Sequence, residues 1–184
     1  ESFRHEDFKK FAKEQRKAVE YGFDKGVSFF MSLDRERYLE IGGMDNLFKP
    51  CFSEDDDLIL RLNVAKFNLI TASDAICYHF VSKTSRFSDE FSDKTKIIEH
   101  RSSRNFTRKW GQRRSLNILQ RYNVGIEIIS CTFELLATLE PFADNIYVGL
   151  GAEVDKYIQQ EQSHTKYDLS KRIKSLDDER INDY

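Results

Sequence analysis

Hydrophobic residues recur at helical spacing in the N-terminal region of the chain. Between Asp7 and Glu20 the apolar side chains fall near one face of a segment rich in Lys, Glu and Arg: Phe8, Phe11, Ala12 and Val19. Apolar residues three or four positions apart lie on the same side of an α-helix, and that side packs against the rest of the protein. Residues 1–25 are therefore predicted to hold an amphipathic packing helix.

Runs of β-branched and aromatic residues predict strands further along the chain. The first run is Gly26–Leu33, and two more, Asn68–Ala72 and Ala75–Phe80, are separated by the turn-like pair Ser73-Asp74. Such residues suit the half-buried surface of a sheet. The last run ends in Y-H-F and so places His79 at a strand end, where a histidine is more often a structural hydrogen-bonding residue than a ligand.

Aspartate and glycine mark the two ends of a short helix between these strands. Asp34 is predicted to cap a helix over Arg35–Ile41, because a carboxylate at this position can accept a hydrogen bond from a free backbone N–H group. Gly42 and Gly43 follow the helix. A residue just after a helix often needs a positive φ, which glycine adopts without steric cost.

An acidic run opens the next predicted helix. The segment from Cys51 to Leu62 reads C-F-S-E-D-D-D-L-I-L-R-L, so that four acids, Glu54 to Asp57, follow Ser53. Ser53 is a predicted N-cap, and carboxylates in a first helical turn are stabilised by unpaired N–H groups and by the positive end of the helix dipole. Helix capping alone would explain this run, so a chemical role depends on its surroundings.

A basic segment follows a polar loop at residues 82–92. Residues 83–114 contain ten Lys or Arg against four acids, and Asp93–Trp110 is predicted to be a helix. The charge indicates either a solvated helix face or a surface that binds phosphates or acidic headgroups. Trp110, which follows Lys109, could stack on a sugar or anchor an interface.

A change of pattern predicts a second module over residues 116–184. Val124–Ser130 is a predicted strand, Phe133–Glu140 a helix stopped by Pro141, and Asn145–Val148 another strand, which together open a βαβ unit. The residues after this unit are polar and partly helical, with no predicted closing strand. We therefore expect a truncated α/β module.

Composition narrows the classes of protein to consider. The formal net charge of −2 argues against a dedicated nucleic-acid or membrane-surface binder, and no apolar run is long enough to cross a bilayer. Three widely spaced cysteines without a C-x-x-C motif favour a reducing compartment over a disulfide framework or a zinc site: Cys51, Cys77 and Cys131. The chain begins at Glu1 with no visible signal peptide, as expected of a piece of a longer protein.

Taken in order, these segments resemble a known enzyme family. Together they are similar to the C-terminal half of a family 2 glycosyltransferase of the GT-A fold. Four segments carry the resemblance: a strand, R-E-R-Y-L-E-I-G-G-M-D-N-L-F, S-E-D-D-D-L-I-L-R-L, and a strand ending in Y-H-F. The resemblance covers about Gly26 to Gly111, and its last part, N-F-T-R-K-W-G from Asn105, resembles a sequence that follows the catalytic core in some bacterial members. It implies an α/β fold in which residues 26–115 form the acceptor-side part of a GT-A-like mixed sheet with flanking helices.

The resemblance also implies roles for residues of the acidic run. Asp55 would be the general base that deprotonates an acceptor hydroxyl in an inverting transfer, with Glu54 and Asp57 beside it at the substrate. A sugar hydroxyl is a poor nucleophile at neutral pH, so a carboxylate kept ionised at a helix N-terminus suits this task. Gly42 and Gly43 would let the backbone approach the acceptor closely.

Other positions take supporting roles in this reading. Arg61 would hold the acidic turn in place rather than touch substrate, while His79 would contact a divalent metal or the donor diphosphate. Trp110 would contribute to substrate binding. We expect Asp55 to face an open cleft, clear of the backbone, and His79 to lie on the same side of the sheet.

The donor side of such an enzyme is not found in this sequence. The family begins with a βαβ nucleotide-binding half and carries a D-x-D at the end of a strand, which holds the Mn²⁺ or Mg²⁺ that binds the diphosphate. The D-x-D of Asp55–Asp57 opens a helix instead, so the chain alone is expected to be inactive.

The parent protein would be a cytoplasmic transferase of polysaccharide biosynthesis that could associate peripherally with a membrane. Its partners would be a nucleotide sugar and a glycan acceptor, and not nucleic acid. The alternative is a non-catalytic binding module that uses residues 83–114, although no aromatic platform or recognition-helix motif accompanies that segment.

Overall fold

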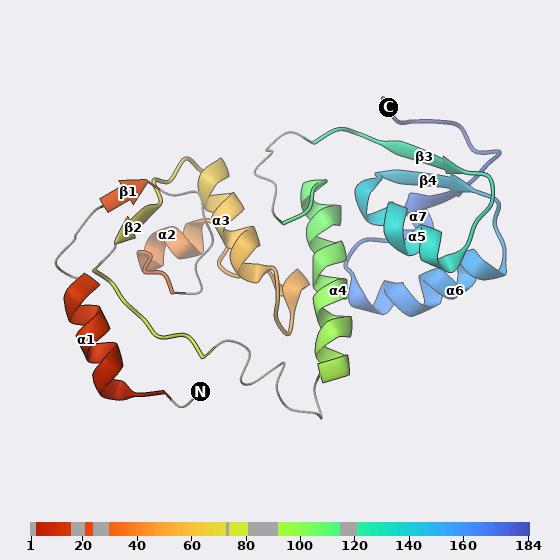
Figure 1. The fold of residues 1–184 in the computed structure, drawn as a ribbon. Helices are drawn as coiled ribbons and strands as arrows, with labels where there is room; N and C mark the ends of the chain where they lie inside the picture. Colours follow the sequence, from red (N-terminus) through yellow and green to blue (C-terminus); the bar gives the residue numbers. More distant parts are fainter. Residues whose placement is uncertain (1–2, 16–20, 24–29, 73, 81–91, 115–120) are drawn as a thin grey trace. The chain divides into compact units, whose positions relative to one another are not determined.

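The chain is an α/β protein that divides into two compact units (Figure 1). The structure is a computed structural model, and it describes residues 3–15, 21–23, 30–72, 74–80, 92–114 and 121–184. The N-terminal unit comprises Glu1–Met44 and Asp55–Thr95, and the C-terminal unit comprises Asp45–Glu54 and Lys96–Tyr184. None of the described helices is long and apolar enough to cross a membrane.

The N-terminal unit combines short helices with a two-stranded antiparallel sheet. Strand β1 (Tyr21–Phe23) pairs with β2 (Ile70–Ala72) in the register Tyr21 opposite Ala72. The α-helices of this part are α1 (His5–Gln15), α2 (Arg35–Glu40) and α3 (Glu54–Val64). Its core forms where α3 buries one face against α2 and the segment after α3: Leu58, Ile59 and Leu62 with Leu33, Tyr38, Ile41, Phe67 and Leu69.

Helix α2 confirms the predicted capping. The Asp34 side chain accepts a hydrogen bond from the N–H group of Arg37 at 3.1 Å, as expected of an N-cap carboxylate. After the helix, Gly42 and Gly43 have φ angles of +88° and +64°. Glycine therefore ends this helix because the chain turns through the left-handed region there.

Two of the predicted strands are not present as such in the described residues. Residues 26–29 of the Gly26–Leu33 run lie outside the described residues, and residues 30–33 have no regular structure, with Phe30 exposed. Ala75–Phe80 is also irregular. Its rings pack with one another and with Phe3 instead: the Phe3 and Tyr78 ring centroids are 4.5 Å apart. Side-chain packing, rather than a ladder of backbone hydrogen bonds, holds this apolar segment.

The C-terminal unit contains a three-stranded parallel sheet in the order β3-β4-β5. Gly125 lies opposite Asn145 in the β3–β4 register, and Ile146 lies opposite Ile173 in the β4–β5 register. The strands are β3 (Gly125–Ile128), β4 (Asn145–Val148) and β5 (Ile173–Ser175). The helices are η1 (Asn46–Phe48), α4 (Ser92–Trp110), α5 (Phe133–Leu139), η2 (Glu140–Phe142), α6 (Ala152–Glu161), η3 (Gln162–His164) and α7 (Leu169–Arg172).

The predicted βαβ unit is confirmed, because β3 and β4 are parallel and α5 connects them. The prediction that the module stops without a closing strand is wrong, since β5 pairs in parallel with β4. A short strand of three residues carries too weak a sequence pattern to be recognised. Apolar side chains from the strands and helices of this unit form one buried core: Ile128, Leu136, Ala143, Ile146, Val148, Val154, Tyr157, Leu169 and Ile173.

The division into units differs from the predicted boundary between residues 115 and 116. Most of α4, from Lys96 on, groups with the C-terminal unit, as does the segment Asp45–Glu54. The sequence placed both inside the region 26–115. Long-range polar contacts of α4, described below, account for this grouping.

Candidate functional site at the start of helix α3

The acidic residues at the start of α3 have different environments, and Asp57 is the most constrained. Its side chain is fully buried, and one carboxylate oxygen accepts a hydrogen bond from Arg61 Nε at 2.8 Å. The two residues are four positions apart and so lie on the same face of the helix. A buried carboxylate needs a paired cation, so the role of Asp57 is structural.

Arg61 also reaches the turn that follows α2. Its two terminal nitrogens donate to the carbonyl oxygens of Ile41 at 2.7 Å and Gly43 at 2.6 Å. A guanidinium has five donors in a rigid plane, so one side chain can bind a carboxylate and two carbonyls together. This confirms that Arg61 holds the acidic turn in place, and it joins the I-G-G and E-D-D-D segments in space.

Asp55 is half-buried and forms no ion pair with any described residue. One carboxylate oxygen accepts a hydrogen bond from the N–H group of Asp56 at 2.9 Å, so the prediction that it would be clear of the backbone is wrong. This bond is formed with the next residue, within the first helical turn. The carboxylate still has lone pairs that can accept a further hydrogen bond.

The turn before α3 shows that the prediction of Ser53 as an N-cap is wrong. Phe52 and Ser53 have φ angles of +75° and +68°, whereas an N-cap residue normally has an extended backbone. The Ser53 hydroxyl is buried and finds no hydrogen-bond partner among the described residues; the same holds for one carboxylate oxygen of Glu54. Two successive non-glycine residues in the left-handed region are a strained backbone, of the kind that proteins concentrate at functional sites.

The two glycines of the preceding turn differ in their surroundings. A Cβ on Gly43 would lie 3.2 Å from the Tyr38 ring, whereas a Cβ on Gly42 would meet no atom within 4 Å. The Tyr38 hydroxyl in turn accepts a hydrogen bond from the N–H group of Met44 at 3.0 Å. Gly43 thus permits close packing inside the protein, and only Gly42 leaves its backbone open to a ligand.

His79 does not occupy the predicted position. It is exposed and lies in the irregular segment 75–80 rather than at a strand end, so no sheet places it on a common side with Asp55. Within the described part of the chain, no three His, Cys, Asp or Glu side chains gather as a metal site requires. The described residues therefore do not fit the divalent metal that the family resemblance implied.

The basic segment is largely engaged in ion pairs inside the C-terminal unit. Arg108 is fully buried, and its Nη2 lies 2.7 Å from Glu140 Oε2 and 3.0 Å from Glu161 Oε1. Arg104 binds both oxygens of Glu161, at 2.9 and 2.6 Å. The Tyr157 hydroxyl donates to Glu140 at 2.9 Å. This set of side chains, the α4 network, explains why α4 belongs to the C-terminal unit.

Burial and charge shift the pKa values of the α4 network in opposite directions. Burial works against ionisation of Glu161, but hydrogen bonds and charge from Arg104 and Arg108 outweigh it and lower the pKa of this carboxyl. Burial, together with the charge of Glu140, raises the pKa of Tyr157 well above its ordinary value. These shifts favour an ionised Glu161 and a neutral Tyr157 phenol, as their hydrogen bonds require.

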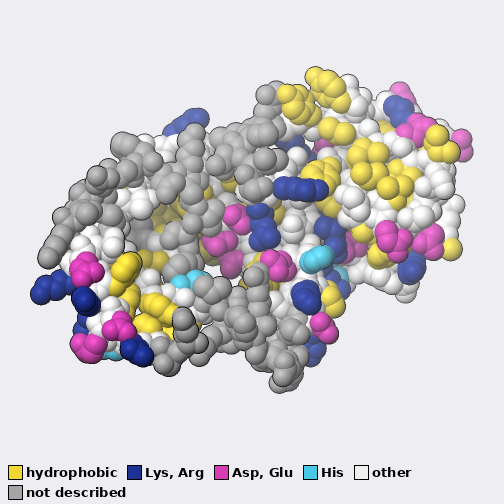
Figure 2. Space-filling view, in the orientation of Figure 1, with side chains coloured by type: hydrophobic (Ala, Val, Ile, Leu, Met, Phe, Trp, Pro, Cys, Tyr) yellow, Lys and Arg dark blue, Asp and Glu magenta, His cyan; other side chains and the backbone are white. Residues whose placement is uncertain are grey.

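The rest of the basic segment is also partly paired. Lys109 Nζ lies 2.8 Å from Asp45 Oδ2, and Arg114 lies 3.6 Å from Glu99. Trp110 is half-buried and packs against Phe106 with ring centroids 6.4 Å apart. On the face seen in Figure 2, Lys and Arg side chains alternate with Asp and Glu over the described C-terminal unit. On this face the described charged residues therefore do not form a single basic surface.

Asp45 is a residue whose environment the sequence did not reveal. Burial opposes its ionisation, yet hydrogen bonds from Lys109, from the N–H group of Leu47 and from Lys166 lower its pKa from 3.8 to about 2. Lys166 is 121 positions away in the sequence, so no local pattern could have identified the pair.

Comparison of the chain with protein-family models, with curated proteins and with solved structures found no match.

Proposed function

We propose that this chain is the acceptor-side part of a nucleotide-sugar-dependent glycosyltransferase and that Asp55 is its general base. The observation that carries the proposal is the contact set of Arg61. It joins the turn at Gly43 to Asp57 on α3. These are two of the four segments on which the family resemblance rests, and they lie together in space.

The geometry separates a structural acid from a chemically available one. Asp57 is neutralised by Arg61, whereas Asp55 has no cation partner among the described residues. The first turn of a helix favours an ionised carboxylate, and a general base must be ionised to accept a proton. Asp55 would take the proton of an acceptor hydroxyl as that oxygen attacks the anomeric carbon of the donor sugar.

The neighbouring backbone suits a carbohydrate acceptor. Gly42 is exposed and has open space where a side chain would stand. The N–H group of Gly42 already donates to the carbonyl of Leu39 at 3.0 Å, but without a side chain the backbone allows a hydroxyl group to approach the Gly42 carbonyl closely. The residues described here do not form a donor or metal site, so the proposal assigns to this chain the acceptor and the proton transfer only.

The test is sugar transfer by the product of the complete gene, assayed with a panel of nucleotide sugars and with Mn²⁺ or Mg²⁺ in the buffer. Asn in place of Asp55 keeps the shape of the side chain but cannot accept the hydroxyl proton. The Asp55→Asn variant should lose about 10²- to 10⁴-fold in kcat. The KM for the donor should change little, because proton transfer is felt in the transition state.

Asp56→Asn is the matched control, since it removes the same charge one residue away. This control should keep turnover within several-fold of the unaltered protein. Equal turnover in the Asp55→Asn protein and the unaltered protein would remove Asp55 from the mechanism and leave the acidic run as a stabilised helix start. The 184-residue chain assayed alone should show no transfer.

A further inference from the structure

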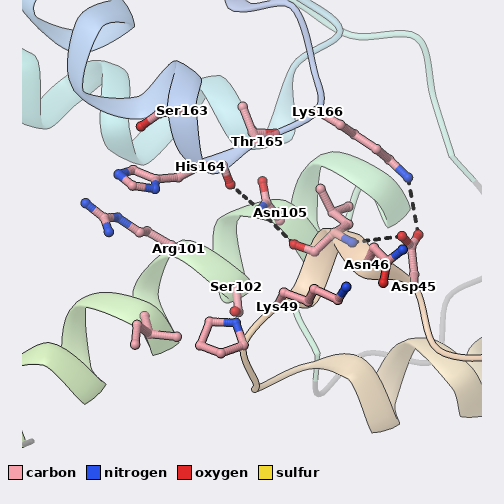
Figure 3. A pocket seen from close by; sticks show the side chains of 13 residues that line it. Asp45, Asn46, Lys49, Arg101, Ser102, Asn105, Ser163, His164, Thr165 and Lys166 are labelled. Atoms are coloured by element: carbon pink, nitrogen blue, oxygen red, sulfur yellow. Dashed lines mark hydrogen bonds and ion pairs between the residues drawn. The ribbon is translucent and has the colours of Figure 1, made fainter.

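A cavity in the C-terminal unit lies apart from the acidic run. Its volume is about 560 Å³, which falls within the range of small-molecule sites. Three segments far apart in the sequence line it: the residues around η1, one face of α4, and η3 with the residues that follow it (Figure 3). All of these segments belong to one compact unit.

Buried hydrogen bonds hold the three segments of the cavity wall together. The Asn105 amide on α4 donates to the carbonyl oxygens of Leu47 at 3.3 Å and His164 at 2.8 Å. Ser102, also buried, donates to the carbonyl of Cys51 at 2.8 Å. Because α4 is bonded in this way to both other segments, the cavity is formed before any ligand enters.

The charges that line the cavity are predominantly positive and uncompensated. Lys49 and Arg101 make no ion pair with any described residue, and they line the cavity together with His164. Figure 3 shows the Arg101 guanidinium beside the His164 ring. The acid of the lining, Asp45, is already engaged by Lys109 and Lys166, at 2.8 and 3.2 Å.

The state of His164 is consistent with an excess of positive charge. Burial, followed by the charge of Arg101, lowers the pKa of this imidazole, and the charge of Arg104 acts in the same direction. Glu161 opposes this shift, but its carboxylate is bound by Arg104 and Arg108. Unpaired cations in a partly closed site attract an anion, which would relieve their repulsion.

We propose that this cavity binds a small molecule through a phosphate group held by Arg101 and His164, whose side chains lie beside each other, while Lys49 on another part of the wall adds positive charge. A guanidinium matches two phosphate oxygens with parallel N–H donors, and a lysine ammonium adds a point charge. The positive charges of Arg101 and Lys49 favour a dianion over a single carboxylate, and the His164 imidazole, whose pKa is lowered, offers a hydrogen bond rather than a charge. The volume of the cavity leaves room for an organic group attached to the phosphate. This site does not depend on the proposed transferase function.

The test is a titration of the full chain with three probes: inorganic phosphate, glucose 6-phosphate and acetate. Binding is followed by calorimetry and by the NMR signals of the four histidines, assigned with a His164→Gln variant. Both phosphates should bind saturably and shift the His164 signal more than the signals of His5, His79 and His100. Acetate should bind at least about tenfold more weakly, because it carries one charge.

Two variants identify the residues that bind the phosphate. Arg101→Gln should weaken phosphate binding about tenfold or more, since it removes a charge-assisted hydrogen bond, whereas Lys49→Gln should weaken it less, since it removes only a more distant charge. Lys171→Gln removes the same charge from an exposed side chain outside the cavity and should leave binding unchanged. Thermal unfolding of all three proteins checks that they remain folded.

The outcomes separate the sources of the anion. Tighter binding of glucose 6-phosphate than of inorganic phosphate would identify a phosphorylated organic ligand, and equal binding would identify phosphate itself. The proposal would be overturned by the absence of saturable phosphate binding, by equal affinity for acetate, or by an equal loss in the Lys171→Gln control.

Discussion

Two helices of this protein carry arginine–carboxylate clusters, and the clusters differ in how completely they are paired. At the start of α3, Arg61 engages Asp57 and two carbonyls, while no cation of the described residues pairs with Asp55. In the α4 network, Arg108 binds Glu140 and Glu161, and Arg172 binds the second oxygen of Glu140 at 2.8 Å. One cluster retains an available acid, and the other uses its charges internally.

The difference shows why a charged motif does not by itself indicate a binding surface. The sequence of α4 is about as rich in charged residues as the sequence of α3. A buried charge without a partner is strongly destabilising, so a network of this kind must be nearly complete. The acid without a cation partner, Asp55, is therefore the better candidate for chemistry.

The largest expected loss of stability comes from breaking the α4 network. Arg108→Met would leave Glu140 and Glu161 with one cation fewer in a buried site. We expect the free energy of unfolding to fall by about 3 to 5 kcal/mol. Urea unfolding followed by circular dichroism measures this value. Lys171→Met, at a side chain that is 85% exposed, should change it by less than about 0.5 kcal/mol. Equal effects of the two variants would contradict a structural role for the network.

A smaller loss is expected from Arg61→Met in the N-terminal unit. The variant leaves a buried carboxylate on Asp57 and two carbonyl groups without their donor, which should reduce the free energy of unfolding by about 2 to 3 kcal/mol. Asp55→Asn is the control within the same helix turn and should cost less than about 1 kcal/mol, the worth of a charge at a helix N-terminus. If Asp55→Asn proved the more destabilising of the two, Asp55 would be a structural acid.

The smallest expected effect is a pH-dependent one at Asp45. Its pKa is lowered from 3.8 to about 2 in the folded protein, so the stabilisation is fully present above about pH 4 and is lost as the pH falls toward 2. Such a shift corresponds to roughly 2 kcal/mol. The difference in unfolding free energy between the unaltered protein and the Asp45→Asn variant should be largest at neutral pH and should become small near pH 2. A difference that stays constant with pH would show that the Lys109 and Lys166 contacts do not act through charge.

Local sequence patterns predicted a substantial part of the fold. The helix expected over Asp93–Trp110 begins at Ser92 and ends at Trp110, and the strand Asn145–Val148 has the predicted bounds. The Asp34 cap and the turn at Gly42 and Gly43 were also correct. These features depend on the preferences of a few adjacent residues and on the spacing of apolar side chains, which are visible in a sequence.

Contacts between side chains that are far apart in the sequence could not be predicted. The Arg108–Glu140 and Arg108–Glu161 contacts join residues 32 and 53 positions apart, and the cavity brings Lys49, Arg101 and His164 together from three segments. No periodicity links such positions. The prediction of a strand at Ala75–Phe80 was wrong for a related reason. Its aromatic rings pack against other rings, but its backbone pairs with no strand among the described residues.

The sequence by itself determined the α/β class, the helical start of the acidic run and the glycine turn before it, because each follows from local backbone preference. Only the tertiary structure decided which charges are available. It paired Asp57 with Arg61, enclosed Arg108 among carboxylates and, within the part of the chain that the structure describes, left Asp55 without a cation. The physical reason is that the energy of a charge depends on its burial and on its partners, and both are properties of the folded chain rather than of neighbouring residues.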